Sequence, residues 1–183
     1  MSEEFFNEND DGNIEEGATD NLVLCYVTCP QDSSKSFVGG LLITDYKSRP
    51  LHFAYVTPVR PTAMQRILYG ATLNEHIQVD VIAKRLFEEL PIVPTVLFVD
   101  NEDILKIQRI VKFPVAYLSK ASETDSDVST LSTIHYKTYT DTFEVQNVVG
   151  QTIANLENVI DLTEPFQRMR EALKESIKTN SEK

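Results

Sequence analysis

Short apolar runs separated by polar turns make up the first part of the chain after residue 21. The runs are Leu22–Thr28, Phe37–Thr44 and Pro50–Val56, and each contains the β-branched or aromatic residues that strands favour. Because only a few residues join one run to the next, we predict three antiparallel strands in a meander. Gly39 and Gly40 inside the second run predict a bulge or a close backbone approach.

Helical spacing of apolar residues replaces this pattern over residues 74–90 and ends at Pro91. The apolar segment Thr95–Val99 is typical of a strand that is buried on both faces of a sheet. A helix that begins at Asp100–Glu102 and a strand at Pro114–Leu118 follow, which predicts a right-handed parallel crossover. The remaining predicted elements are an edge strand at 133–138 and helices at 143–156 and 164–177.

This order predicts an α/β fold with a mixed five- or six-stranded sheet, in which the meander is followed by the parallel crossover and helices lie on the faces. A length of 183 residues and a hydrophobic fraction of 42% suit a single core, so we expect one domain at residues 21–179. The sequence contains no run of ~18 apolar residues and no secretory leader pattern. We therefore expect a cytoplasmic protein with no membrane contact.

The acidity of the chain is concentrated at its start. Residues 1–20 contain eight acidic residues and no Lys or Arg, whereas the rest carries 20 acidic and 17 basic residues, for a net charge of −11 overall. Such a run is typical of a disordered, solvated tail. Phe5 and Phe6 lie inside it, and two adjacent aromatic residues suit docking on another protein. A second polar segment, 119–132, predicts a surface loop.

A proline-bracketed corner joins the third strand to a short helix. Pro58 and Pro61 fix φ at two points and keep the preceding residues extended, so Thr57–Thr62 has few conformations to lose on folding. Thr62 is placed to cap the helix that follows, which we expect to end near Gly70. The corner should therefore hold its side chains in a defined arrangement.

Specific polar side chains are densest around this corner. Arg60, Gln65, Arg66 and Tyr69 form our predicted binding surface for another protein. The arginines are also suited to phosphate contacts with nucleic acid. The alternative is that Arg60 and Arg66 pair with local carboxylates such as Glu75.

Classical catalytic groups are sparse in the sequence. Cys25 and Cys29 would lie ~13 Å apart on one side of a strand, too far for a disulfide, so we interpret both as reduced core or strand-end residues. The three histidines fall in separate elements, and no nucleophile-elbow, zinc-protease, dinucleotide or phosphate-loop motif occurs.

The order of elements over residues 21–175 resembles the RNase H-like superfamily. That resemblance implies a nuclease in which carboxylates hold two Mg or Mn ions against the phosphodiester. It implies an essential Asp midway along the first strand and another at the end of the fourth. Asp100 fills the fourth-strand position, but Cys25 lies where the first Asp would be. The resemblance would place Asp161 as the carboxylate of the C-terminal helix.

Two of these assignments have alternatives. The resemblance also implies a carboxylate on the helix that lies between the third and fourth strands, and either Glu75 or Asp80 would take that place. Asp100 alternatively caps the helix that follows it, by accepting the free amides of Glu102 and Asp103.

We therefore predict a non-catalytic accessory or adaptor subunit that binds another protein, with no cofactor. The alternative is a divalent-metal-dependent nuclease with Asp100 as ligand, or a nucleic-acid-binding protein on the same scaffold. A domain that stays slightly acidic without its tail argues against a dedicated nucleic-acid binder.

Overall fold

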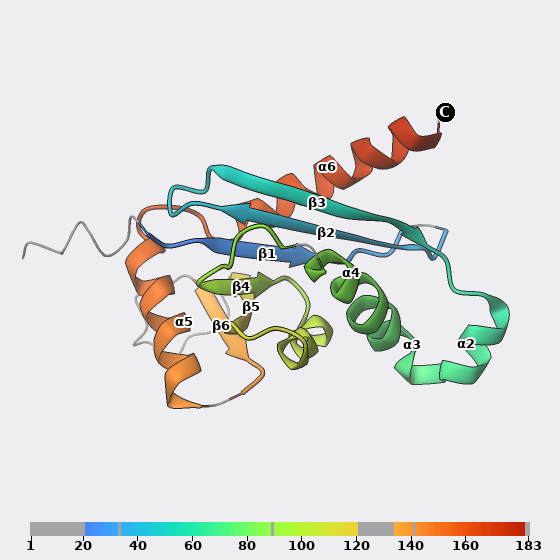
Figure 1. The fold of residues 1–183 in the computed structure, drawn as a ribbon, viewed down its shortest axis with the longest axis horizontal. Helices are drawn as coiled ribbons and strands as arrows, with labels where there is room; N and C mark the ends of the chain where they lie inside the picture. Colours follow the sequence, from blue (N-terminus) through green and yellow to red (C-terminus); the bar gives the residue numbers. More distant parts are fainter. Residues whose placement is uncertain (1–20, 33, 89, 121–133, 141, 182–183) are drawn as a thin grey trace, which may run out of the picture.

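A six-stranded sheet in the order β3-β2-β1-β4-β5-β6 runs through the molecule (Figure 1). The structure is a computed structural model that describes residues 21–32, 34–88, 90–120, 134–140 and 142–181. The strands are β1 (Leu24–Thr28), β2 (Phe37–Thr44), β3 (Pro50–Val59), β4 (Val96–Val99), β5 (Val115–Lys120) and β6 (Ile134–Thr138). The first strand of the described residues is thus central, which explains why all five residues of β1 are buried.

Strand directions divide the sheet into two parts. β1, β2 and β3 pair antiparallel, whereas β4 lies parallel to β1 and β5 lies parallel to β4. β6 returns antiparallel to β5 and forms the other edge. The predicted meander, parallel crossover and mixed sheet are all confirmed, with six strands.

Helices cover both faces of the sheet, as predicted. The face that carries Cys25 and Val27 packs against η2, α4 and η3, and the face that carries Leu24 and Tyr26 packs against α5 and α6. The helical segments are α2 (Ala63–Tyr69), η1 (Gly70–Thr72), α3 (Leu73–Glu75), the π-helical η2 (His76–Ala83), α4 (Lys84–Phe87), the 3₁₀-helical η3 (Glu102–Arg109), α5 (Phe143–Leu156) and α6 (Glu164–Ser181). None of those in the described ranges has the length and apolar character needed to span a membrane.

The two glycines of β2 allow both helix layers to approach its backbone. A Cβ atom added at Gly39 would lie 2.0 Å from Cγ2 of Ile82, and one at Gly40 would lie 3.1 Å from Cδ1 of Leu173. The pairing of β2 with β3 also shifts register between Phe37 and Gly39. The register shift is consistent with the predicted bulge, and the close approach to the two glycines is made by side chains of the helices.

Three local expectations need correction. β3 continues to Val59 rather than ending at Val56, because Pro58 lies on the sheet edge, where a missing amide removes no ladder bond. The helix predicted at 74–90 has π-helical bonding over His76–Ala83. The cap of η3 is Asn101, whose side chain accepts the amide of Asp103, and not Asp100.

Two predictions fall on residues outside the described ranges. These are the acidic tail at 1–20 with Phe5 and Phe6, and most of the loop predicted at 119–132. They remain predictions.

Candidate functional site

The corner between β3 and α2 is fixed by local chemistry. Pro61 is buried, and Thr62 starts α2 with a capping box. The hydroxyl of Thr62 accepts the amide of Gln65 at 3.2 Å, and the Gln65 side chain accepts the amide of Thr62 at 2.9 Å. The predicted cap is confirmed, and Gln65 is part of it, which the sequence analysis did not foresee.

α2 extends beyond the end of the sheet. Gly70 ends it with a positive φ of 50°, a conformation that glycine adopts without steric cost, and the chain then turns back into α3 (Figure 1). The structure describes every residue of α2, and none of them is buried. The helix therefore gains no stability from burying a face in the core.

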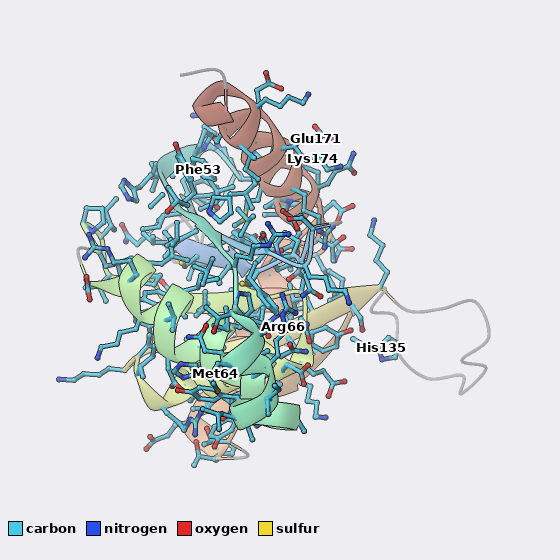
Figure 2. All side chains as sticks on the ribbon, turned by 90° about the vertical axis from the view of Figure 1, so that its right-hand side faces the viewer. Phe53, Met64, Arg66, His135, Glu171 and Lys174 are labelled. Carbon is cyan, nitrogen blue, oxygen red and sulfur yellow. The ribbon has the colours of Figure 1, made fainter. Side chains whose placement is uncertain are left out.

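The outer face of α2 is apolar. Met64, Ile67 and Leu68 have the i, i+3, i+4 spacing of one helix face and are 64%, 76% and 74% exposed. Figure 2 shows Met64 and Arg66 on this projecting part of the molecule. The sequence analysis missed these three residues. Their helical spacing was visible, but the same spacing is usual for a face that packs on a core.

Basic and aromatic residues flank the apolar face. Arg60 donates to the carbonyl oxygen of Ser34 at 3.4 Å, and within the described residues Arg66 makes no ion pair. The ring of Tyr69 stacks on His76 with centroids 4.2 Å apart. We call this set the α2 surface; it consists of Arg60, Met64, Arg66, Ile67, Leu68 and Tyr69.

Glu75 does not neutralise the arginines of the corner. Its two carboxylate oxygens accept Lys106 Nζ at 2.5 Å and Arg109 Nη2 at 2.6 Å. The hydrogen bonds from Lys106 and Arg109 lower the pKa of Glu75 below its ordinary value. The alternative in which Glu75 pairs with Arg60 or Arg66 is therefore wrong.

Asp100 lies at the carboxyl edge of the two central parallel strands. Its Oδ2 accepts the hydroxyl of Thr28 at 2.7 Å and Arg170 Nη2 at 2.5 Å, and its side chain is only 13% exposed. Both partners are more than 69 positions away in the sequence, so no local pattern indicated them. Asp100 thus joins β1, β4 and α6, and does not cap η3.

Gln78, and not a carboxylate, faces this edge from the helical layer. Its Nε2 donates to the carbonyl oxygen of Cys29 at 3.4 Å, and its Oε1 is buried without a partner in the described structure. Asp80, one of the two carboxylates considered for this place, is exposed and contacts His76 at 3.2 Å. We call Thr28, Cys29, Gln78, Asp100 and Arg170 the β1–β4 edge. Within the described ranges, no three His, Cys, Asp or Glu residues form a group that could hold a metal ion.

The cysteines next to this edge are poor nucleophiles. Both are free and buried, as predicted. Burial raises the pKa of Cys29 to about 12, and the negative charge of Asp100 adds to the effect. Burial also raises the pKa of the Cys25 thiol. Both thiols are therefore protonated at neutral pH.

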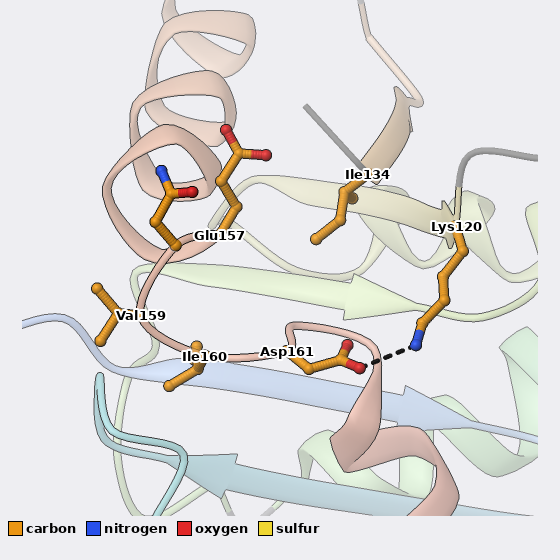
Figure 3. Close-up of a pocket in the computed structure, with 7 residues that line it drawn as sticks. Lys120, Ile134, Glu157, Val159, Ile160 and Asp161 are labelled. Carbon is orange, nitrogen blue, oxygen red and sulfur yellow. Dashed lines mark hydrogen bonds and ion pairs between the residues drawn. The ribbon is translucent and has the colours of Figure 1, made fainter. Parts of the chain in front are cut away.

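Asp161 is not part of the β1–β4 edge. It lies beside a cavity of about 370 Å³ (Figure 3). Its Oδ2 accepts Lys120 Nζ at 2.9 Å, and its Oδ1 accepts the amide and the hydroxyl of Thr163 ahead of α6. Partial burial acts to raise the pKa of Asp161, but the hydrogen bonds from Lys120 and Thr163 outweigh it and lower the pKa to about 2. Both of its oxygens are thus engaged by protein groups.

Comparison with known proteins places the chain in no family. No family model and no curated protein matches it. Two crystal structures of Marinitoga piezophila Argonaute show a weak structural likeness to this chain, one with 5′ OH guide RNA and one with 5′ OH guide RNA and target DNA. Their sequence identities are 11% and 13%, and their TM-scores are 0.38 and 0.36. Each match covers 79% of this chain and 27% of the Argonaute chain, so the chain spans about a quarter of the Argonaute length.

Proposed function

We propose that the protein is a non-catalytic adaptor or accessory subunit that binds another protein through the α2 surface. The observation that carries this proposal is a well-capped helix that has no buried residue and whose outer face is apolar. A contiguous apolar patch with a polar rim is typical of a protein interaction site.

The size of the apolar face is consistent with such a role. Fully burying a Met, Ile or Leu side chain contributes about 1.5–3 kcal/mol. Met64, Ile67 and Leu68 would together supply roughly 4.5–9 kcal/mol, against an association cost of about 4–15 kcal/mol. The flanking Arg60 and Arg66 would add specificity through acidic groups of the partner.

The order and directions of the strands support an RNase H-like scaffold for this adaptor. On that scaffold Cys25 lies where the first-strand Asp is expected, and Asp100 is paired with Arg170. Asp161, the expected carboxylate of the C-terminal helix, is engaged by Lys120 and Thr163. A protonated thiol is unsuited to two-metal catalysis, and both carboxylates are already bound by protein groups. This chemistry favours binding over phosphodiester cleavage.

A pull-down from the native cell tests the proposal. The bait is the full chain carrying Ile67→Glu and Leu68→Glu, beside the unchanged chain and a matched control, Val93→Glu. Val93 is 77% exposed, as much as Ile67, but lies ahead of β4 and outside the α2 surface. We expect the double variant to lose a stoichiometric partner, with an unchanged Tm, while the control keeps it.

Three outcomes would overturn the proposal. A partner that is retained by the double variant would show that α2 is not the interface. Capture that disappears on nuclease treatment and weakens steeply with salt would indicate nucleic-acid binding. Metal-dependent cleavage that Asp100→Asn abolishes would establish the nuclease alternative.

A further inference from the structure

The strand β3 forms an open edge of the sheet. It pairs with β2 on one side, and in the described part of the chain no strand pairs with its other side. With ten residues it is the longest strand of the sheet. A long edge strand presents backbone amides and carbonyls to which another strand can add.

Charged side chains, the usual protection of such an edge, are absent from β3. The strand PLHFAYVTPV contains no Asp, Glu, Lys or Arg. The opposite edge strand, β6, instead carries Lys137, paired with Glu102 at 2.5 Å. On β3 only Pro50 and Pro58 oppose pairing, because proline has no amide to donate. The pairing-competent stretch is therefore Leu51–Thr57.

The exposed face of this stretch is apolar. Leu51, Phe53 and Tyr55 alternate along the strand on one face and are 48%, 36% and 40% exposed. The rings of Phe53 and Tyr55 stack with centroids 6.1 Å apart.

We propose that β3 pairs antiparallel with β3 of a second copy of this chain, so that two sheets join into one across a two-fold axis. The sequence of β3 favours a second copy as the occupant of this edge. Leu51–Thr57 is uncharged and has a proline at each end, so an antiparallel copy aligns the same seven residues with each other and places no like charges opposite.

The prolines also define the register of this pairing. The midpoint of Leu51–Thr57 is Ala54, so the two-fold axis passes between Ala54 and its copy. Phe53 then lies opposite Tyr55 of the second copy, and the two cross-strand aromatic pairs lie on the exposed face. Such pairs stabilise antiparallel strands by about 0.2–1 kcal/mol each. This interface is independent of the α2 surface.

Sedimentation equilibrium of the full chain tests the dimer. We expect a concentration-dependent dimer whose Kd rises at least about tenfold, equivalent to 1.4 kcal/mol, in Leu51→Lys/Phe53→Lys. The matched control Ile67→Lys, at an exposed apolar position of α2, should leave the Kd unchanged. If the double change lowers the Tm, Thr57→Lys replaces it as a milder variant at an exposed position of β3.

A cross-link tests the register separately. Directly opposed residues have Cα atoms about 4.5–5.5 Å apart, within disulfide range. Ala54→Cys should therefore form a dimer disulfide, while Met64→Cys should not; the native Cys25 and Cys29 are buried and do not compete. A monomer at every accessible concentration would overturn the proposal. So would a dimer that neither Leu51→Lys/Phe53→Lys nor Thr57→Lys weakens.

Discussion

The α2 surface and the β1–β4 edge use their side chains in opposite ways. At the edge, the charge of Asp100 is 13% exposed and is satisfied by Thr28 and Arg170 from two other elements. On α2, apolar side chains are about two-thirds exposed or more, and Arg66 has no ion pair within the described residues. The edge therefore contributes to the stability of the fold, while α2 offers unused binding energy. This contrast is the reason that the proposed function is assigned to the projecting helix.

The largest predicted difference is in stability. Asp100→Ala should lower the free energy of unfolding by about 1.5–3 kcal/mol, because it removes hydrogen bonds to a charged group and leaves Thr28 and Arg170 without their acceptor. Met64→Ala should change it by less than about 0.5 kcal/mol, as is usual for an exposed position. Urea denaturation measures both. Equal losses would remove the distinction between the two regions.

A smaller effect is expected at the start of α2. Thr62→Ala removes a capping hydroxyl and should cost about 1 kcal/mol of local stability. Hydrogen exchange of the α2 amides, that of Gln65 above all, should accelerate. Thr142→Ala is the matched control, since Thr142 precedes α5 without making a side-chain cap bond. Equal acceleration at both helix starts would contradict the role of the capping box.

Substitution of Gln78 should raise the free energy of unfolding, whereas the substitutions above lower it. Its buried Oε1 has no partner in the described structure and its one hydrogen bond is long at 3.4 Å. Replacing a poorly satisfied buried amide by an apolar group of similar size is often neutral or stabilising. Gln78→Leu should therefore raise the unfolding free energy by up to about 1 kcal/mol. A clear loss would indicate that the amide has a partner or a functional role at this edge.

The smallest effect concerns Asp161, which is 48% exposed and therefore screened by solvent. Its pKa of about 2 in the folded protein is below the ordinary value of 3.8, so its ionised form stabilises the fold. That contribution is complete above about pH 4 and is lost as the pH falls towards 2. Asp161→Asn should lower the Tm slightly at neutral pH and flatten its decline between pH 4 and 2. An unchanged acid profile would contradict this.

The sequence predicted the elements better than it predicted their contacts. β2 and α5 have the predicted limits, because apolar periodicity and turn residues are local signals. Asp100 and Asn101 are adjacent Asx residues, and only the backbone geometry decides that Asn101 is the cap. The Asp100–Arg170 pair joins residues 70 positions apart, which no single-sequence pattern encodes.

The polar residue that faces the β1–β4 edge was missed. Carboxylates were expected from the intervening helix, so Glu75 and Asp80 were considered and Gln78 was not. The apolar residues Val79, Ile82 and Leu86 are buried, as their helical spacing predicts, but that spacing does not tell which polar neighbour reaches the edge. The exposure of Met64, Ile67 and Leu68 could not be predicted from the sequence either. Helical periodicity defines an apolar face, but it does not tell whether another part of the protein covers that face.

The central position of β1 has a consequence for synthesis on the ribosome. β1 pairs with β4, and Leu24 and its partner Val96 are 72 residues apart. At about 5–20 residues per second, roughly 4–14 s pass between the emergence of the two strands. During this interval the meander β1–β3 can form, but both β1 and β3 present open edges. The nascent chain is then at its most exposed to mispairing, so co-translational chaperone binding should be strongest before β4 emerges.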